Sequence, residues 1–409
     1  MTSRSESLQT SPYLTCIRPG DPSPIVYAID EAKPTTPEVT PGPQGGFGVI
    51  GLERTVEWHS DVRALHALQD AAAAPVDRRL LIERFGAEIV TDLVDRRWLQ
   101  PPDQLCVDYL LTTAQIEVTA HCNWGCQFCP VSLHRKPAAT MPMPLFREII
   151  EKIAVYDTIR YVTFHFYNEP TLDPHFDERL DVLREHDLRL KLFTNGSKLG
   201  PERTAALHHS GVLDLLLVNL PALREDEFHS LTGARTYAAS LRNVEAAVEL
   251  GLPVKIAVNG QGPNLERRVA ELRVRFGPLG VDVNPTLLSD RAGEVGGSYH
   301  QAVRVDGPLR GCSWPVNHAH FSVTGEMFIC CNDYHQRETF GCVTSGSVHE
   351  IMTSPRAVLV RRRVFGVAEA PEDYLCRRCH DQLLDFPLRQ FRPLATFPVN
   401  TRDRADNDD

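Results

Sequence analysis

The chain has 409 residues, which is long enough for two or three domains. Its net charge of −10 argues against a protein that binds nucleic acid by neutralising phosphates, because such binding needs clustered Lys and Arg. No apolar run reaches the roughly 18 residues of a membrane span, and the polar N-terminus lacks a signal-peptide pattern. We therefore expect a cytoplasmic protein with no nucleic-acid or membrane partner.

The N-terminal part of the chain divides into two regions. Residues 1–46 end in a stretch rich in Pro, Gly and Thr, and they predict a poorly ordered segment and linker. In residues 47–110, apolar side chains such as Val62, Leu65 and Leu68 recur at helical spacing. This region predicts a small helical unit, either a winged-helix unit or a helical cap.

In residues 111–306, short β-branched runs alternate with longer amphipathic stretches. The predicted strands are 116–119, 161–166, 189–193, 213–219, 254–258 and 281–284. The predicted helices are 144–156, 174–185, 201–209, 238–250 and 265–276. Six strands with helical crossovers predict an α/β fold, a partial (β/α)6 barrel like part of a TIM barrel. The functional groups are then expected at the carboxyl ends of the strands.

The alternation breaks near residue 307. Six of the eleven cysteines lie between positions 312 and 379, so residues 307–400 predict a small module held together by metal. In the cytoplasm thiols stay reduced, which favours metal ligands over disulfides. Residues 401–409 predict a polar tail, and the basic run 361–363 is interpreted as a solvated helix face.

The first group of cysteines follows the first predicted strand. Cys122, Cys126 and Cys129 have the spacing CxxxCxxC. Three thiolates leave one iron of a four-iron cluster without a protein ligand. On spacing alone a zinc site remains open, with His121 or His134 as the fourth ligand.

With Phe128 before its last cysteine, this motif resembles the CxxxCxΦC signature of the radical S-adenosylmethionine (SAM) superfamily, where Φ is aromatic. The resemblance implies a [4Fe–4S] cluster whose open iron binds SAM, and Phe128 near the adenine. It also implies that reductive cleavage of SAM yields a 5′-deoxyadenosyl radical, which takes a hydrogen atom from the substrate. The electron would come from an external reductant such as flavodoxin or ferredoxin.

Residues 167–170 (YNEP) follow the second predicted strand and resemble the GGEP motif that contacts the SAM amino group. Tyr167 and Asn168 replace its two glycines. The resemblance implies SAM contacts here and at later strand ends, namely at Asn168, Glu169, Pro170, Thr194, Asn195, Asn219, Val258, Asn259 and Arg291. Taken singly, an Asn at a strand end is more often a turn former. His165 is interpreted either as a substrate or SAM contact or as a core histidine.

The second group of cysteines is Cys312, Cys330, Cys376 and Cys379. The first pair has the spacing CX12GX4C and the second is CxxC, which resembles the shortened SPASM module called twitch. The resemblance implies one auxiliary [4Fe–4S] cluster. Structural zinc, and haem attachment at the CxxCH of residues 376–380, are the alternatives.

Two further cysteines, Cys331 and Cys342, are candidate hydrogen-atom donors, as thiols are in radical epimerases. Enzymes with SPASM or twitch modules crosslink, epimerise or excise parts of ribosomally made peptides, or they oxidise or epimerise small molecules such as aminoglycosides and sugar alcohols. The N-terminal helical region favours a peptide. The leading hypothesis is a radical SAM oxidoreductase or epimerase acting on a peptide. The alternatives are dehydrogenation or epimerisation of a sugar-like small molecule, and a non-catalytic iron–sulfur or zinc scaffold.

Overall fold

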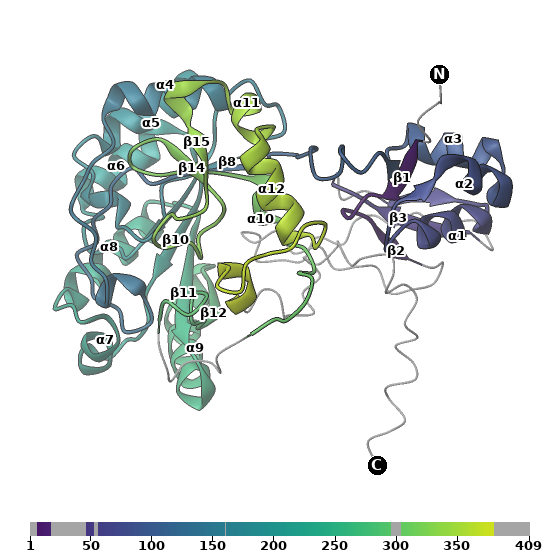
Figure 1. The fold of residues 1–409 in the computed structure, drawn as a ribbon. Helices are drawn as coiled ribbons and strands as arrows, with labels where there is room; N and C mark the ends of the chain where they lie inside the picture. The colour runs from purple at the N-terminus through teal and green to yellow at the C-terminus, as the bar shows by residue number, and fades with distance from the viewer. Residues whose placement is uncertain (1–5, 18–45, 53–55, 160, 296–303, 380–409) are drawn as a thin grey trace, which may run out of the picture.

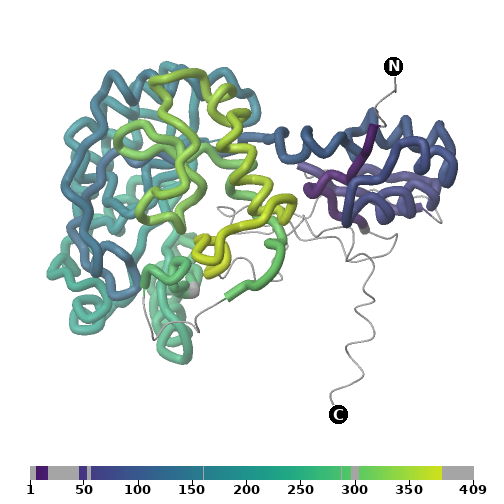
Figure 2. Tube along the Cα trace, viewed as in Figure 1, coloured from purple at the N-terminus to yellow at the C-terminus, as the bar shows by residue number. Residues whose placement is uncertain are grey.

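The computed structural model describes residues 6–17, 46–52, 56–159, 161–295 and 304–379. Figures 1 and 2 show a small N-terminal unit beside a larger body, with one extended connection leading from the first to the second. The expected polar tail 401–409 and the end of the expected C-terminal module, residues 380–400, lie outside the described residues.

The N-terminal unit combines two small antiparallel sheets with three helices. One sheet has the order β5-β1-β6 and the other the order β2-β3-β4. The strands are β1 (Ser7–Thr10), β2 (Thr15–Ile17), β3 (Phe47–Ile50), β4 (Val56–His59), β5 (Val76–Asp77) and β6 (Leu99–Gln100). The helices are α1 (Val62–Asp70), α2 (Arg78–Phe85) and α3 (Ala87–Asp95). Asp61 and Asp77 cap α1 and α2 by accepting from backbone N–H groups at 2.8 Å.

This unit has a hydrophobic core of its own, which includes Leu8, Phe47, Leu68, Leu93 and Trp98. The prediction of poor order is wrong for residues 6–17, because β1 and β2 pair with strands later in the chain. Runs of three or four residues carry too little periodicity to be recognised, and long-range pairing stabilises them. Residues 18–45 lie outside the described residues.

The six strands predicted for the barrel are present and parallel, and the partial (β/α)6 barrel is confirmed. They are β7 (Thr113–Ile116), β8 (Tyr161–Thr163), β9 (Leu190–Thr194), β10 (Leu213–Asn219), β11 (Val254–Gly260) and β12 (Asp282–Leu287). Their helices are α4 (Met143–Ile153), α5 (Phe176–Glu185), α6 (Pro201–Ser210), α7 (Glu225–Thr232), α8 (Tyr237–Glu249) and α9 (Gly262–Phe276). The sequence did not predict α7. The first strand ends where its prediction began, because residues 117–119 leave the sheet as a loop.

The two faces of the barrel sheet differ in chemistry. Phe164, just after β8, packs edge-on against Phe146 of α4 and Phe176 of α5, with ring centroids 5.6 and 6.4 Å apart. Side chains two residues apart share a face of a strand. Val162 and Phe164 therefore point toward the helices, whereas Tyr161 and Thr163 point into the barrel.

The C-terminal module extends the same sheet. Its first strand, β13 (His318–Phe321), pairs in parallel with β7, and β14 (Glu326–Phe328) and β15 (Thr339–Cys342) follow antiparallel. The described sheet therefore has nine strands, in the order β12-β11-β10-β9-β8-β7-β13-β14-β15. The module also contains α10 (Trp314–Asn317), α11 (Val348–Met352) and α12 (Pro355–Val364). Five short 3₁₀ turns occur in the described parts of the barrel and the module together. They are η1 (Pro130–Ser132), η2 (Pro170–Leu172), η3 (Gly277–Leu279), η4 (Val343–Ser345) and η5 (Leu375–Arg378).

One part of the basic run on α12 is buried rather than solvated. The guanidinium of Arg361 is fully buried and donates to the backbone carbonyls of Cys106, Val107 and Met352 at 2.7–3.1 Å. The interpretation of residues 361–363 as a solvated face is therefore wrong for Arg361. Its hydrogen bonds to Cys106 and Val107 instead hold α12 against the segment that leads from the N-terminal unit into the barrel.

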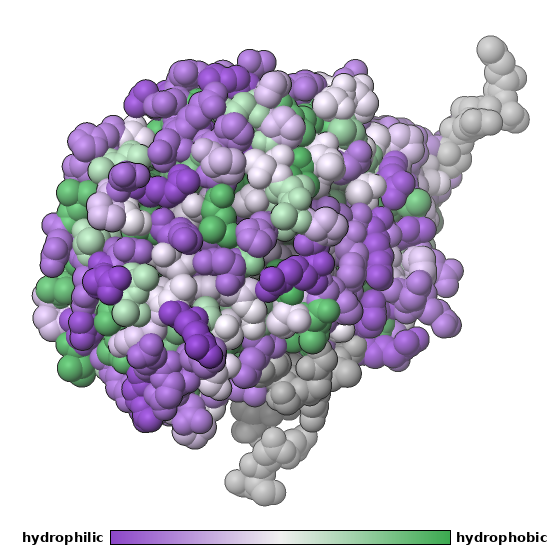
Figure 3. Space-filling model, turned by 90° about the vertical axis from the view of Figure 1, so that its left-hand side faces the viewer, coloured by the Kyte–Doolittle hydropathy of each residue, from purple (hydrophilic) through white to green (hydrophobic). Residues whose placement is uncertain are grey.

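One face of the outer surface is mostly polar. Figure 3 shows a face on which apolar side chains are scattered among hydrophilic ones. Across the described ranges, we find no helix that combines the length and hydropathy of a membrane span.

A buried carboxylate joins the barrel to the C-terminal module. Glu117 is 1% exposed and lies 3.2 Å from the Lys136 ammonium, and it accepts from the amide of Gln336 at 2.9 Å and the N–H of Val323 at 3.2 Å. We expect Glu117→Ala to lower the free energy of unfolding by about 3 kcal/mol, because three donors lose their acceptor. Urea unfolding tests this, with the exposed Glu249→Ala as a control expected to change stability by less than about 0.5 kcal/mol. Equal losses in the two variants would contradict it.

Candidate functional site

The loop after β7 gathers the first three cysteines. Cys126 is buried, and Cys122 and Cys129 are half-buried. Burial, and then the neighbouring thiols of Cys129 and Cys122, raise the pKa of Cys126 well above its ordinary value. Burial also raises the pKa of Cys122 to about 12. Such thiols ionise when a metal supplies compensating positive charge, so the loop fits a thiolate-bound metal group.

Backbone contacts hold this loop in shape. The N–H groups of Trp124 and Val131 lie against the sulfur atoms of Cys122 and Cys129 and partly offset the rise in their pKa. The indole of Trp124 donates to Thr236 at 3.1 Å, and the N–H of Gly125 donates to the Thr232 carbonyl at 2.9 Å. The loop is therefore anchored on the ends of α7 and α8.

Glu169 connects two strand ends. Its carboxylate is 1% exposed and accepts from the backbone N–H of Thr171 and Asn195 and from the hydroxyls of Thr171 and Thr194, at 2.5–3.0 Å. Its own N–H donates to the His121 carbonyl at 2.8 Å. Both carboxylate oxygens are thus engaged within the protein. The expected SAM contact at Glu169 stays a prediction, and this geometry favours backbone groups of the loop over the carboxylate.

Most other expected SAM contacts lie near this end of the barrel. The amide of Asn195 donates to Asn123 of the cysteine loop at 2.9 Å, and Asn259 donates to Asn219 at 2.8 Å. Asn168 bonds the backbone of residues 164 and 166, which shapes its own turn. Phe128 is 8% exposed within the main core, and Pro170 begins η2. SAM contacts at these positions stay predictions.

Two of the expected SAM contacts, Val258 and Arg291, differ from the others in their surroundings. The side chain of Val258 is fully buried in the hydrophobic core, so only its backbone can meet a ligand. Arg291 has a positive φ of 52°, and its guanidinium lies 5.9 Å from the ring of Tyr167. Its positive charge lowers the pKa of Cys129, although burial outweighs it. Arg291 therefore lies near the cysteine loop, whereas Val258 faces away.

The second group of cysteines lines one small cavity in the C-terminal module. Cys312, Cys330, Cys376 and Cys379 all contribute, together with Trp314 and Asn332 among others. Asn332 donates its amide N–H to the sulfur of Cys379 at 3.3 Å. Burial, and then the neighbouring thiols, raise the pKa of Cys330 well above its ordinary value. Four converging thiols fit a fully ligated cluster, and the amide is typical of groups that tune one.

The two candidate hydrogen-atom donors differ in position. The thiol of Cys331 acts electrostatically on both Cys330 and Tyr167. The sulfur of Cys342, at the end of the edge strand β15, lies 3.2 Å from the hydroxyl of Thr344. Cys331 therefore lies near Tyr167 and the second cysteine group, and both thiols stay candidate donors. Within the described residues, no group of three or more His, Cys, Asp or Glu side chains is arranged for a single metal ion.

His165 gives the barrel a predicted pH response. Burial, and then the charge of Arg291, lower the pKa of His165 from 6.5 to about 4. Between about pH 4 and pH 6.5 the unfolded chain binds a proton at this position that the folded chain does not. The free energy of unfolding is therefore highest above pH 6.5, and it falls as the pH decreases below that value. We expect His165→Phe, which keeps the ring stacked on Phe193, to reduce this slope by up to about 1.4 kcal/mol per pH unit. Urea unfolding at about pH 5 and pH 7 tests this, and unchanged slopes would contradict it.

Comparison with known families identifies the two cysteine regions. The radical SAM superfamily model matches residues 116–273, and the model of the SPASM iron–sulfur cluster-binding domain matches residues 312–380. Together the two ranges span more than half of the chain. The chain is a radical SAM enzyme. Within that superfamily it belongs to the subgroup that carries a SPASM domain.

Relatives include enzymes that act on different molecules. The chain is 22% identical over 278 residues to S-adenosyl-L-methionine-dependent 2-deoxy-scyllo-inosamine dehydrogenase from Niallia circulans. The matched residues cover 67% of this chain and 95% of that enzyme. The chain is also 27% identical over 143 residues to mycofactocin maturase MftC from Mycobacterium ulcerans, covering 35% of this chain and only 38% of the maturase.

Among solved structures, SuiB from Streptococcus suis bound to its precursor peptide SuiA has a TM-score of 0.56 and 12% identity. That similarity covers 92% of this chain and all of the SuiB chain. SuiB bound to S-adenosylmethionine has a TM-score of 0.54 and 13% identity, and it covers 81% of this chain and 96% of SuiB. At these identities the similarity is one of fold.

Proposed function

We propose that this radical SAM enzyme modifies a ribosomally made peptide and that its N-terminal unit binds the leader segment of that peptide. The observation that carries the proposal is this unit itself, an arrangement of three helices and small antiparallel sheets around a separate core. The radical reaction takes place in the barrel and does not require such an appended unit. A peptide that is too long for the barrel can bind to the appended unit as well.

The strand β4 and the helix α3 offer a suitable surface. Among the described strands, β4 pairs only with β3, so its other edge has no strand partner. An extended peptide can add to such an edge through main-chain hydrogen bonds, while its side chains contact the neighbouring helix.

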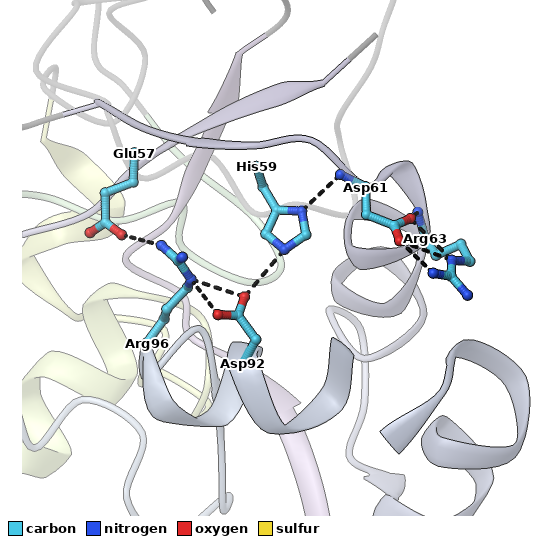
Figure 4. Close-up of polar contacts among 6 residues, drawn as sticks. All are labelled: Glu57, His59, Asp61, Arg63, Asp92 and Arg96. Carbon is cyan, nitrogen blue, oxygen red and sulfur yellow. Dashed lines mark hydrogen bonds and ion pairs between the residues drawn. The ribbon is translucent and has the colours of Figure 1, made fainter. Parts of the chain in front are cut away.

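Polar and charged side chains connect β4 with α3, as Figure 4 shows. Glu57 lies 2.8 Å from Arg96, Arg96 lies 2.9 Å from Asp92, and Asp92 lies 3.2 Å from His59. These partly exposed pairs contribute little to stability. They are free to exchange partners with the charges of a bound peptide.

Two comparisons support this function. The fold similarity to SuiB in complex with its precursor peptide extends over 92% of this chain. The match to the inosamine dehydrogenase covers 67% of it, leaving a third without a counterpart. That same match, over nearly the whole dehydrogenase, favours small-molecule dehydrogenation as the second candidate function.

In the proposed function, each group of residues in the barrel has its own role. Cys122, Cys126 and Cys129 would hold the [4Fe–4S] cluster that binds SAM, and together these would supply a 5′-deoxyadenosyl radical for hydrogen abstraction. Glu169 keeps the neighbouring strand ends at fixed positions. SAM would lie against the strand-end residues named above. Cys331 is the proposed hydrogen donor if the product is an epimer.

The C-terminal cavity would hold one auxiliary [4Fe–4S] cluster on Cys312, Cys330, Cys376 and Cys379. All four protein ligands are then used, which leaves no iron open to substrate and suits an electron acceptor. The external electron donor would be a flavodoxin or ferredoxin.

The two candidate functions separate in one assay. The reconstituted full chain, with reductant and SAM, is incubated with peptides encoded by short reading frames beside the gene, or with 2-deoxy-scyllo-inosamine. A mass change in a peptide, with 5′-deoxyadenosine formed in proportion, is the expected result. Turnover of the inosamine alone would overturn the peptide function.

Leader binding is predicted to depend on β4 and α3. We expect Glu57→Ala and Arg96→Ala each to weaken binding of the modified peptide about fivefold, since each removes a charge beside the strand edge. The control is Arg63→Ala, which breaks a similar ion pair with Asp61 on another helix of the same unit. Fluorescence anisotropy measures the affinities. A larger loss in the control than in either test variant would contradict the prediction.

A further inference from the structure

Three polar side chains form a row across the inner face of the sheet, which we call the inner polar row. His320 of β13 is aligned with Gln115 of β7, and Gln115 is aligned with Thr163 of β8. Residues aligned on adjacent strands lie side by side on one face. Thr163 faces away from the helices, so all three side chains point into the barrel.

The inner polar row is deeply buried but lacks hydrogen-bond partners. Gln115, Thr163 and His320 are 3%, 2% and 1% exposed. Across the part of the chain that the structure describes, the amide nitrogen of Gln115, the hydroxyl of Thr163 and both ring nitrogens of His320 have no partner. Each such group costs free energy, and buried polar groups are normally paired. Three adjacent cases indicate that something other than the protein completes the row.

Neighbouring residues connect the row with both cysteine groups. The ring of His320 is 5.4 Å from that of Trp314, which also lines the cavity of the second cysteine group. The residue after His320, Phe321, accepts from the N–H of Glu117, five residues before Cys122. One step further toward the strand ends lies His165, whose Nδ1 is also buried without a partner in the described chain.

The chemistry of the row matches a neutral polar group. A hydroxyl both donates and accepts, a neutral imidazole has one donor and one acceptor, and the amide nitrogen donates. Burial, and then the neighbouring His318 and His165, keep the pKa of His320 well below its ordinary value. The ammonium of Lys191, aligned with Thr163, lies 3.6 Å from the ring of Tyr161, two residues toward the start of β8. Its charge is therefore directed away from the row.

We propose that His320, Gln115 and Thr163 bind a neutral hydroxyl or carboxamide group of the substrate inside the barrel. The C-terminal module then contributes to substrate recognition through β13 as well as carrying a cluster. The inference rests on the proposed function only for the source of that group, which is a Ser, Thr, Asn or Gln side chain of a peptide. A sugar-like molecule presents the same chemistry.

The test uses the reconstituted full chain and three probes, followed by saturation-transfer NMR. N-acetylthreonine amide represents the peptide source, myo-inositol the polyol source, and N-acetylaspartate is the anionic control. We expect both neutral probes to bind and the anion not to. Thr163→Val and His320→Phe, which preserve shape, should each weaken binding about tenfold. His318→Phe, on the same strand outside the row, should bind like the wild type.

Iron content and the free energy of unfolding should stay close to the wild-type values in all variants, which separates lost recognition from misfolding. Failure of the neutral probes to bind, tighter binding of the anion, or equal binding by wild type and row variants would overturn the proposal and leave ordered water as the partner. Leader binding is measured separately. Myo-inositol binding without any peptide modification would overturn the peptide function and leave the row intact, whereas peptide turnover unaffected by the row variants would overturn the row alone.

Discussion

Cys126→Ala is expected to abolish SAM cleavage and to lower the iron content from about eight to about four atoms per chain. Cys126 is buried, and its pKa is raised by its surroundings and by the two neighbouring thiols. An alanine there removes one of three ligands, and no other cysteine lies between residues 130 and 311 to replace it. Formation of 5′-deoxyadenosine should fall to the level seen without protein.

Two variants serve as controls for this result. Cys376→Ala should also lose about four irons, from the second cavity, but it should still cleave SAM. Cys16→Ala, in the separate core of the N-terminal unit, should keep all of the iron. Iron assay, Mössbauer spectroscopy and chromatography of 5′-deoxyadenosine measure the outcome. A Cys126→Ala protein that still cleaves SAM would show that this motif does not hold the catalytic cluster.

Arg179→Met is expected to cause the largest loss of stability, about 3–5 kcal/mol in the free energy of unfolding. Arg179 of α5 and Asp173 are both fully buried, with Nε and Oδ2 2.5 Å apart. The same guanidinium donates to the Met141 carbonyl at 2.5 Å. Without Arg179 the carboxylate of Asp173 stays buried without a counter-charge, with the N–H of His175 still donating to it at 3.0 Å.

The matched control lies on the same helix. Arg184→Ala removes an ion pair with Asp181 in which both side chains are more than half exposed, and it should change stability by less than about 0.5 kcal/mol. The double variant Arg179→Met with Asp173→Asn should recover part of the loss, because it no longer buries an unpaired charge. Urea unfolding measures all three. Equal effects of Arg179→Met and Arg184→Ala would contradict this account of the buried pair.

The features that could be predicted from the sequence are local. Cys122, Cys126 and Cys129 lie within eight residues, so their spacing alone indicates that they bind one metal site together. Five of the six barrel strands overlap their predicted ranges by at least three residues, because a buried strand in such a sheet is a short β-branched run between turn signals. The SAM contacts expected at these strand ends come from the resemblance to the radical SAM superfamily, and they stay predictions.

The features that could not be predicted depend on contacts between distant segments. The strand β13 pairs with β7 although about two hundred residues separate them, and this pairing alone brings His320 beside Gln115. Nothing in the local sequence around either residue indicates the other. The burial of Arg361 could not be predicted for the same reason. Three consecutive arginines are typical of a solvated helix face, and the carbonyls of Cys106 and Val107 that bind Arg361 are distant in the sequence.

One measurement tests most directly whether this chain uses SAM as a radical source. The wild-type chain is reconstituted anaerobically with iron and sulfide, reduced with dithionite and supplied with SAM. We predict that 5′-deoxyadenosine and methionine form in equal amounts, with both four-iron sites loaded. A fully iron-loaded chain that forms no 5′-deoxyadenosine would contradict this prediction.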